Sequence, residues 1–267
     1  MNDVNGQAQI LAFLAEHRRD FGPRLLDVPS GGGPVVEGAR AAGYDVVELD
    51  LFPRPRMRGV CADACAPLPF RDGAFDVVLS MEGIEHFEHQ AGFVRECARV
   101  LRPGGWLLLT TPNVLSLSAR AAHLLTGGRV RSHGFINEAT TLYKRDGRRL
   151  YHGHAFLIDA FRLRYLLRLA DLELRELRGT MLSPSSLLLA PLVPCIRLAN
   201  RTAARRMRRR IISEAQRIAG EGRLPAEALA REMRGLANSS ALFFSKKLIF
   251  LATKALHARP GTPPPAE

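Results

Sequence analysis

Residues 24–33 read RLLDVPSGGG, an apolar run that ends in an acidic residue and a glycine-rich turn. A stretch compatible with a helix follows, and residues 44–51 form a second apolar run that carries its own acid, Asp50. This order predicts a βαβ unit that binds a nucleotide-like ligand. The glycines let the backbone approach the ligand closely, and the second acid meets ribose hydroxyls.

Composition places the chain among ordinary globular proteins. It has 267 residues, 46% of them hydrophobic, which suits one main domain with a large core. The first nine residues lack a signal-peptide pattern, and no apolar run reaches the ~20 residues needed to cross a bilayer. The four cysteines show no CxxC pairing and no partners for a zinc site, which favours a reducing compartment. We therefore expect a cytoplasmic protein.

Strand and helix patterns alternate along most of the chain. Helices are predicted over residues 4–19, 35–42, 85–101, 116–125 and 157–170. Strands are predicted over residues 24–28, 45–49, 57–62, 75–80, 106–111, 172–177 and 248–252. This alternation predicts an α/β fold with a doubly wound, mostly parallel seven-stranded sheet.

Two stretches depart from that plan. Residues 126–153 form a basic, glycine-containing loop that we expect over the carboxyl ends of the strands. Residues 181–245 separate the last two strands by far more than a hairpin needs, which predicts an inserted, basic, amphipathic helical subdomain. The main domain then comprises residues 1–180 together with 246–256, and residues 257–267 form a disordered, proline-rich tail.

The ordered motifs resemble those of the class I S-adenosylmethionine-dependent methyltransferases, of the type 11 and type 23 groups. The matching segments are residues 26–33, 63–64 with 68–70, 75–80, 85–87 and 101–105. The resemblance spans about residues 20–180 plus the final strand, and it implies a Rossmann-like fold. Pro29 departs from the pattern, because the family usually has glycine there and proline removes a backbone N–H. We interpret this departure as a variant loop that still binds the cofactor.

The resemblance also implies which residues bind S-adenosylmethionine. Asp27 would orient the loop and the methionine amino group, and Asp50 would bind the ribose, with Glu48 as the alternative if the register differs by two. The remaining implied contacts are Ser30, Gly31 and Gly33 in the loop, Leu51 beside the ribose acid, Asp63 and Ala64 at the adenine, and Ser80 and Met81 at the methyl donor.

A hydroxyl acceptor needs a base or a Lewis acid, because its own pKa lies far above neutrality. Glu82, Glu85 and His86 would share one face of the helix predicted from residue 85. Their spacing resembles the Glu-x-x-Glu-His motif of metal-dependent O-methyltransferases that act on RNA 3′ ends and quinone-precursor catechols. In those families a later histidine completes the set, here His154 in GHAF (153–156). The resemblance thus implies a divalent metal on Glu82, Glu85, His86 and His154. The alternative is a metal-free enzyme in which His154 or His86 is the general base, with Glu82 as a further catalytic candidate.

Basic residues are concentrated in the C-terminal third. Residues 1–180 hold 23 Lys and Arg against 21 Asp and Glu, whereas residues 181–267 hold 15 against 5. An apolar run at 187–196 precedes seven arginines with no intervening acid. Residues 187–211 therefore read as an interfacial helix on an anionic membrane, at the inner membrane face. The alternative is a capping subdomain whose apolar stripe packs on the core.

Together with the basic segment, the resemblance implies an O-methyltransferase acting on a sugar, a glycolipid or a small diol near the membrane surface. The acceptor would be a small molecule, a saccharide or a lipid-linked compound. One alternative is an RNA methyltransferase of the 2′-O type, which the basic segment favours. Against it, the arginines lack interleaved aromatic residues for base stacking. Another alternative is a non-catalytic module that binds the cofactor and recruits partners. The patterns do not define the oligomeric state.

Overall fold

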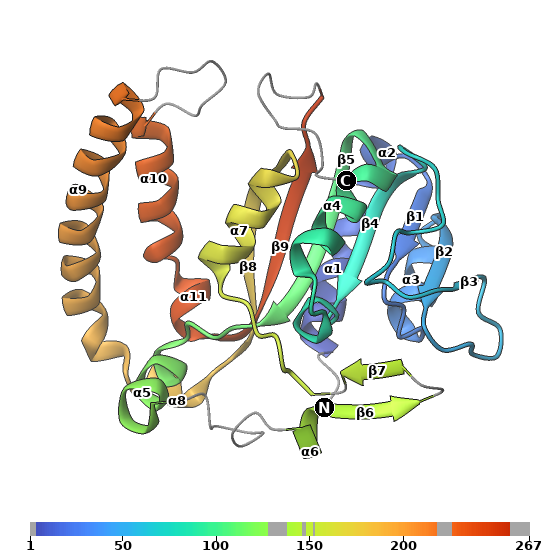
Figure 1. Ribbon diagram of the computed structural model, residues 1–267, viewed down its shortest axis with the longest axis horizontal. Helices are drawn as coiled ribbons and strands as arrows, with labels where there is room; N and C mark the ends of the chain where they lie inside the picture. Colours follow the sequence, from blue (N-terminus) through green and yellow to red (C-terminus); the bar gives the residue numbers. More distant parts are fainter. Residues whose placement is uncertain (1–3, 128–137, 146–147, 152, 218–225, 257–267) are drawn as a thin grey trace.

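A seven-stranded sheet runs through the computed structural model, which describes residues 4–127, 138–145, 148–151, 153–217 and 226–256 (Figure 1). The strand order is β3-β2-β1-β4-β5-β9-β8. The strands are β1 (Arg24–Asp27), β2 (Asp45–Asp50), β3 (Gly59–Cys61), β4 (Phe75–Met81), β5 (Leu101–Pro112), β8 (Leu172–Leu182) and β9 (Ser245–Lys254). β1 to β5 pair in parallel, and β9 is antiparallel to β5 and β8. The predicted mostly parallel, seven-stranded sheet is confirmed.

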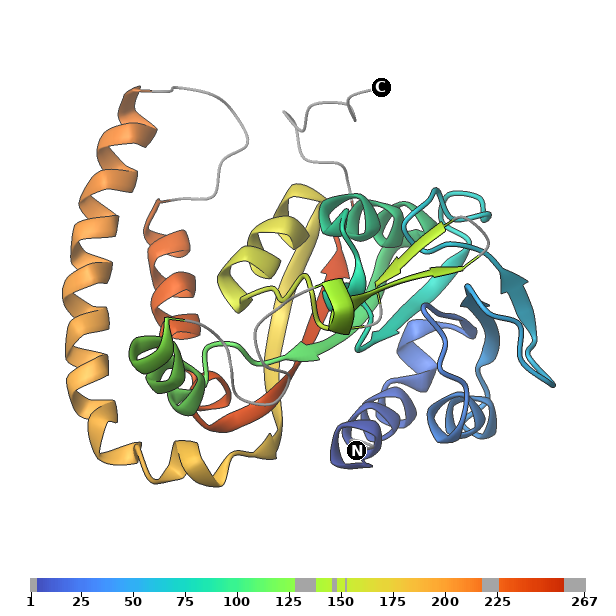
Figure 2. The same ribbon diagram turned by 60° about the horizontal axis from the view of Figure 1, so that its bottom comes forward.

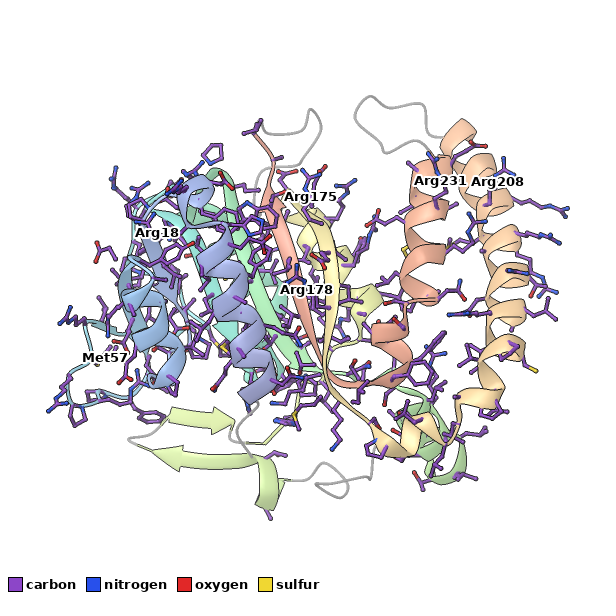
Figure 3. All side chains as sticks on the ribbon, turned by 180° about the vertical axis from the view of Figure 1, so that it is seen from behind. Arg18, Met57, Arg175, Arg178, Arg208 and Arg231 are labelled. Carbon is purple, nitrogen blue, oxygen red and sulfur yellow. The ribbon has the colours of Figure 1, made fainter. Side chains whose placement is uncertain are left out.

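Helices cover both faces of this sheet. α1 (Val4–Glu16), α2 (Arg18–Phe21) and α3 (Pro34–Ala41) lie on the face shown in Figure 3. α4 (Gln90–Val100) and α7 (Ala160–Leu169) lie on the opposite face. Successive strand residues point to opposite faces, so Leu25 and Val77 pack with α1 and α3, whereas Leu26 and Val78 pack with α4 and α7. The sheet is buried on both faces, as its apolar strands require.

The predicted start of the helix over residues 85–101 is wrong. The chain leaves β4 with Glu82 in the left-handed region (φ 51°), forms a single 3-10 turn, η1 (Ile84–His86), and becomes extended at Phe87. α4 then begins at Gln90. Glu82, Glu85 and His86 therefore do not share a helix face, and the prediction that they would is wrong.

A small hairpin follows the fifth strand of the sheet. After α5 (Leu117–Thr126), the described part of residues 126–153 comprises α6 (Glu138–Thr141), β6 (Leu142–Arg145) and β7 (Arg148–Tyr151). Figure 2 shows the β6–β7 hairpin in front of the carboxyl ends of β4 and β5. The rest of this predicted loop, 128–137, 146–147 and 152, lies outside the described residues, as does the predicted tail at 257–267.

The connection between β8 and β9 is helical. It contains α8 (Pro184–Leu187), the 3-10 turn η2 (Ala190–Leu192), α9 (Val193–Arg217), α10 (Ala226–Ala237) and α11 (Ser240–Phe244). α9 and α10 lie side by side beyond β8 (Figure 1). Arg164 of α7 holds α10 through two hydrogen bonds to Glu232, of 2.8 and 2.6 Å. We propose that residues 181–245 form a separate subdomain.

Within the described ranges, no helix combines the length and the apolar character needed to cross a bilayer.

Candidate active site

The glycine-rich loop between β1 and α3 offers bare backbone to a ligand. Ser30 N donates to Leu49 O (2.8 Å), which ties the loop to β2. Gly32 and Gly33 have φ of +66° and +78°, a conformation that side chains oppose. A Cβ placed on Gly31 or Gly33 would meet no atom within 4 Å. The loop therefore has open space beside it, as the implied cofactor role of these glycines requires.

The ring of Pro29 packs against Gly83, a glycine that follows the end of β4. A Cβ on Gly83, just after β4, would lie 2.4 Å from Pro29 Cδ, so only glycine fits against the proline ring. This contact brings the residues after β4 directly against the cofactor loop. Gly83 was not among the residues predicted from the sequence, although a glycine immediately after a strand could have suggested such a close approach.

Two buried polar groups face the same edge of the sheet. Asp27 ends β1, and burial raises the pKa of its carboxyl to about 7. Ser80, near the end of β4, is fully buried, and its Oγ has no hydrogen-bond partner in the described part of the chain. A cationic ligand would stabilise the ionised Asp27, and a polar ligand would satisfy Ser80. Both groups fit the methionine portion of the cofactor.

The two acids of β2 have different environments. Glu48 is buried and bonded to Arg40 (2.8 Å), Arg54 (3.0 Å) and Ser30 Oγ (3.1 Å). Asp50 is half-buried, accepts from Phe52 N (2.9 Å) and lies 3.7 Å from Arg54. Glu48 is occupied in holding the loop, so Asp50 is the acid that retains capacity for ribose hydroxyls.

Arg54 is a residue that the sequence argument missed. Its guanidinium binds the Ser30 carbonyl as well as Glu48, and it lies next to Gly32. It thereby links the end of β2 to the glycine-rich loop. Its distance from the loop in sequence left no periodic signal that could have identified it.

The other proposed cofactor contacts lie around this edge. Asp63 accepts a hydrogen bond from Cys65 N (2.8 Å), which fixes the turn after β3. Ala64 is buried next to it, and Leu51 and Met81 are half-buried after β2 and at the end of β4. Their contacts with the cofactor remain predictions.

Glu85, His86 and His154 come together beside the loop. One ligand atom from each lies within 4.8 Å of the others, and Glu85 Oε1 lies 4.0 Å from His154 Nε2. The His86 and His154 rings meet edge to face, with centroids 5.3 Å apart. We call these three residues the Glu-His-His cluster. It contains three of the four residues proposed as metal ligands.

Backbone contacts explain how His154 reaches residues far away in the sequence. Phe156 N donates to Glu85 O (3.0 Å), and the Gln90 side chain donates to Phe156 O. His86 Nδ1 lies 3.0 Å from Gly153 O. Residues 153–156 are thus fastened along the turn after β4, and His154 lies over Glu85.

Glu85 is the least solvated acid of the site. Its side chain is fully buried, Oε2 accepts a hydrogen bond from Thr111 (3.3 Å), and Oε1 has no hydrogen-bond partner among the residues described. Burial first, and repulsion from Glu82 second, raise the pKa of its carboxyl to about 8. A carboxylate oxygen left without a donor beside two imidazoles is a donor set that suits a divalent cation. The residues therefore fit the implied metal.

Glu82 is engaged elsewhere. Its Oε2 lies 2.7 Å from Lys247 Nζ of β9, and its Oε1 accepts from Thr110 (3.1 Å). It is not a member of the Glu-His-His cluster. Lys247 was missed because the sequence places it at the start of the last strand, where nothing indicates a neighbour on β4.

Comparisons with known proteins relate the chain to methyltransferases. Residues 26–109, which contain the glycine-rich loop and most of β5, match the family model described as "Methyltransferase domain". The ubiquinone biosynthesis O-methyltransferase of Xanthomonas oryzae pv. oryzae is 29% identical over 205 residues, covering 68% of this chain and 79% of that protein.

Solved structures show the same fold. An S-adenosylmethionine-dependent methyltransferase from Archaeoglobus fulgidus matches with a TM-score of 0.50 at 14% identity, over 93% of this chain and 94% of that one. The cyclase SpnF matches with a TM-score of 0.50 at 21% identity, over 93% and 81%. Because the second of these is a cyclase, the fold alone does not define the reaction.

The family model, the curated relative and the glycine-rich site together define the class of enzyme. The chain belongs to the class I S-adenosylmethionine-dependent methyltransferases. It is a transferase, and S-adenosylmethionine is its cofactor.

Proposed function

We propose that this enzyme methylates a hydroxyl oxygen of a small diol, a sugar or a glycolipid, close to a membrane surface. The observation that carries the proposal is the Glu-His-His cluster, which adjoins the cofactor loop through the contact of Gly83 with Pro29. The names of the curated relatives, which are O-methyltransferases, support oxygen as the methylated atom.

Methyl transfer from a sulfonium is an in-line displacement, so the protein must align the acceptor oxygen and remove its proton. His154 is the group best placed to accept that proton, because its imidazole is partly exposed and lies beside the Glu85 carboxylate. An ionised Glu85 would stabilise the imidazolium that forms. In this arrangement Glu85 acts as a positioning residue and His154 as the base.

In the alternative, metal-dependent arrangement, the same three residues would hold a divalent cation, and His154 would be a ligand instead of the base. If His86 Nδ1 carries the proton shared with Gly153 O, Nε2 keeps the lone pair that a metal needs. When bound, the cation would lower the pKa of a hydroxyl of the acceptor and favour a vicinal diol. Glu82 and Lys247 then border the acceptor position rather than the metal.

RNA 2′-O-methylation is the competing proposal, and the arginines of α9 and α10 favour it. These two helices contain no aromatic residue on which a base could stack. The saccharide or lipid acceptor is therefore preferred.

A methyl-label assay tests the proposal. The purified enzyme receives labelled S-adenosylmethionine and separate lipid, saccharide and RNA fractions of source cells, with and without a chelator. We expect label in the lipid or saccharide fraction, lost in His154→Ala and kept in the control His123→Ala, whose histidine is exposed on α5. Label confined to RNA would overturn the acceptor class, and activity that resists the chelator would remove the metal.

A further inference from the structure

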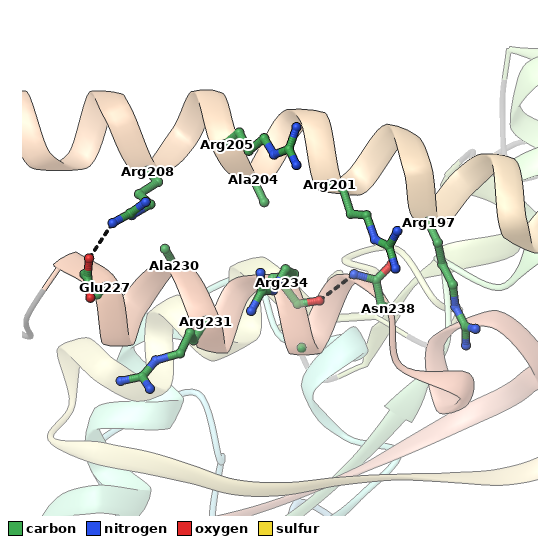
Figure 4. Close-up of a pocket in the computed structure, with 11 residues that line it drawn as sticks. Arg197, Arg201, Ala204, Arg205, Arg208, Glu227, Ala230, Arg231, Arg234 and Asn238 are labelled. Atoms are coloured by element: carbon green, nitrogen blue, oxygen red, sulfur yellow. Dashed lines mark hydrogen bonds and ion pairs between the residues drawn. The ribbon is translucent and has the colours of Figure 1, made fainter.

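A large pocket between α9 and α10 is lined by arginines from both helices. It measures about 950 Å³ and lies on the far side of β8 from the glycine-rich loop (Figures 1 and 4). Small residues of the two helices, among them Ala204 and Ala230, leave this space between them. We call the pocket the arginine groove, and its basic residues are Arg197, Arg201, Arg205, Arg208, Arg231 and Arg234.

The positive charge of the groove is nearly uncompensated. Glu227 is the single acid among its lining residues, and it pairs with Arg208 (Figure 4). Among the described residues, the other five guanidinium groups have no ion-pair partner. The arginines of α9 extend over about 16 Å of helix, at 1.5 Å per residue. Figure 3 shows Arg208 and Arg231 on the two neighbouring helices. So many like charges at close range favour a ligand with several negative charges.

Exposed leucines lie just before α9 and in its first two turns, at the end of the helix that carries Arg197. Leu188 is 82% exposed, and Leu192 and Leu198 are more than half exposed. Leu192 ends the turn before α9, and Leu198 is the neighbour of Arg197 in the sequence. We call these three residues the leucine patch. An anion-binding groove beside exposed aliphatic side chains matches an amphipathic ligand, with phosphate groups next to hydrocarbon.

We propose that the arginine groove and the leucine patch form the surface by which this enzyme docks on a bilayer containing anionic phospholipids. The guanidinium groups bind lipid phosphates, and the leucines enter the boundary between headgroups and acyl chains. The proposal extends the membrane-proximal part of the proposed function, because it assigns the partner and the residues that contact it. A nucleic acid would leave the leucine patch without a partner.

Vesicle co-sedimentation of the full chain tests this docking. Vesicles of phosphatidylcholine alone are compared with vesicles of phosphatidylcholine and phosphatidylglycerol, without acceptor or cofactor. The groove variant carries Arg201→Gln, Arg205→Gln, Arg231→Gln and Arg234→Gln. The control variant removes the same charge from exposed arginines elsewhere, by Arg19→Gln, Arg71→Gln, Arg95→Gln and Arg162→Gln.

We expect the wild type and the control variant to bind the anionic vesicles. The groove variant should bind at least about tenfold more weakly, since each basic residue near the surface contributes several-fold. A leucine variant, Leu188→Ser with Leu192→Ser and Leu198→Ser, should also bind more weakly. Unchanged thermal unfolding and binding of S-adenosylhomocysteine would show that these variants are folded.

Equal binding by the groove and control variants would overturn the proposal. So would tighter binding of a short single-stranded RNA than of anionic vesicles, because it would assign the groove to nucleic acid. Both results are independent of methyl transfer. An enzyme that binds vesicles but labels only RNA would contradict the proposed acceptor and leave the docking surface intact.

Discussion

The Lys247 ammonium group, at the start of β9, lies 2.7 Å from the Glu82 carboxylate at the end of β4. Asn113 fixes this end of β9, because its amide donates to three backbone carbonyls, including Ser245 O (2.8 Å). Lys247 also lowers the pKa of Glu85, opposing the larger effect of burial. The positive charge of Lys247, a residue far from Glu85 in the sequence, thus acts on the Glu-His-His cluster.

Replacing Lys247 by methionine should lower kcat by about tenfold or more, because Glu82 loses a charged partner and repels Glu85 more strongly. The binding of S-adenosylhomocysteine should change little, since the ion-pair partner of Lys247 is Glu82 and not a residue of the glycine-rich loop. Steady-state kinetics and calorimetry measure the two effects. Lys246→Met is the matched control, because Lys246 is exposed and its side chain has the opposite direction in the strand. Equal activity of both variants would refute a role for Lys247.

The two acids of β2 should respond differently to mutation. Asp50→Ala should weaken binding of S-adenosylhomocysteine by about tenfold, the effect of one or two lost hydrogen bonds. Glu48→Gln should instead lower the free energy of unfolding by about 2 kcal/mol, because it disrupts a buried carboxylate bonded to two arginines. Titration calorimetry and denaturant unfolding separate the effects. Cofactor binding unaltered by Asp50→Ala would show that the ribose acid is misassigned.

Substitutions of Gly83 and Gly31 test how the glycine-rich loop packs and whether it binds the cofactor. Gly83→Ala should destabilise the protein by about 1–3 kcal/mol, because the new methyl group overlaps the Pro29 ring. Gly31→Ala meets no protein atom and should leave stability unchanged while weakening cofactor binding. Thermal unfolding with and without S-adenosylhomocysteine compares the two variants. A stable Gly83→Ala protein with normal cofactor affinity would contradict the close packing described here.

Stability should depend on pH through Glu85. Its pKa of about 8 lies above the ordinary value of 4.5, so the folded state binds more protons than the unfolded state between these values. The contribution of Glu85 to the free energy of unfolding is therefore complete below pH 4.5 and is lost as the pH rises through 8. Glu85→Gln should remove this loss and raise the melting temperature at pH 8 relative to the wild type.

Glu96 is the control with the opposite sign. The Arg99 guanidinium holds the pKa of Glu96 below its usual value, so its contribution is present above 4.5 and is lost as the pH falls through the lower folded pKa. Glu96→Gln should thus lower stability at neutral pH. If both variants shifted the pH profile in the same direction, the raised pKa of the buried Glu85 carboxyl would be refuted.

The fold and the position of the glycine-rich loop could be predicted from the sequence, because they depend on local patterns. The apolar period of β1, its terminal acid and the glycines that follow all lie within ten residues. The pairing of Glu85 and His86 with His154 was also proposed, from a motif resemblance, although the helix assumed for it does not exist. Contacts set by tertiary structure, such as Arg54 on the Ser30 carbonyl and Lys247 on Glu82, left no signal in the local pattern.

Leu182, the last residue of β8, is the register partner of Ser245, the first residue of β9. The chain therefore leaves the sheet and returns to it at the same place, and residues 183–244 form an insertion between two paired antiparallel strands. Such an insertion can lengthen, shorten or be exchanged without altering the order of the strands. Changes in α9 and α10, the helices that carry the proposed docking surface, can therefore leave the pairing of β8 with β9 in the catalytic sheet intact.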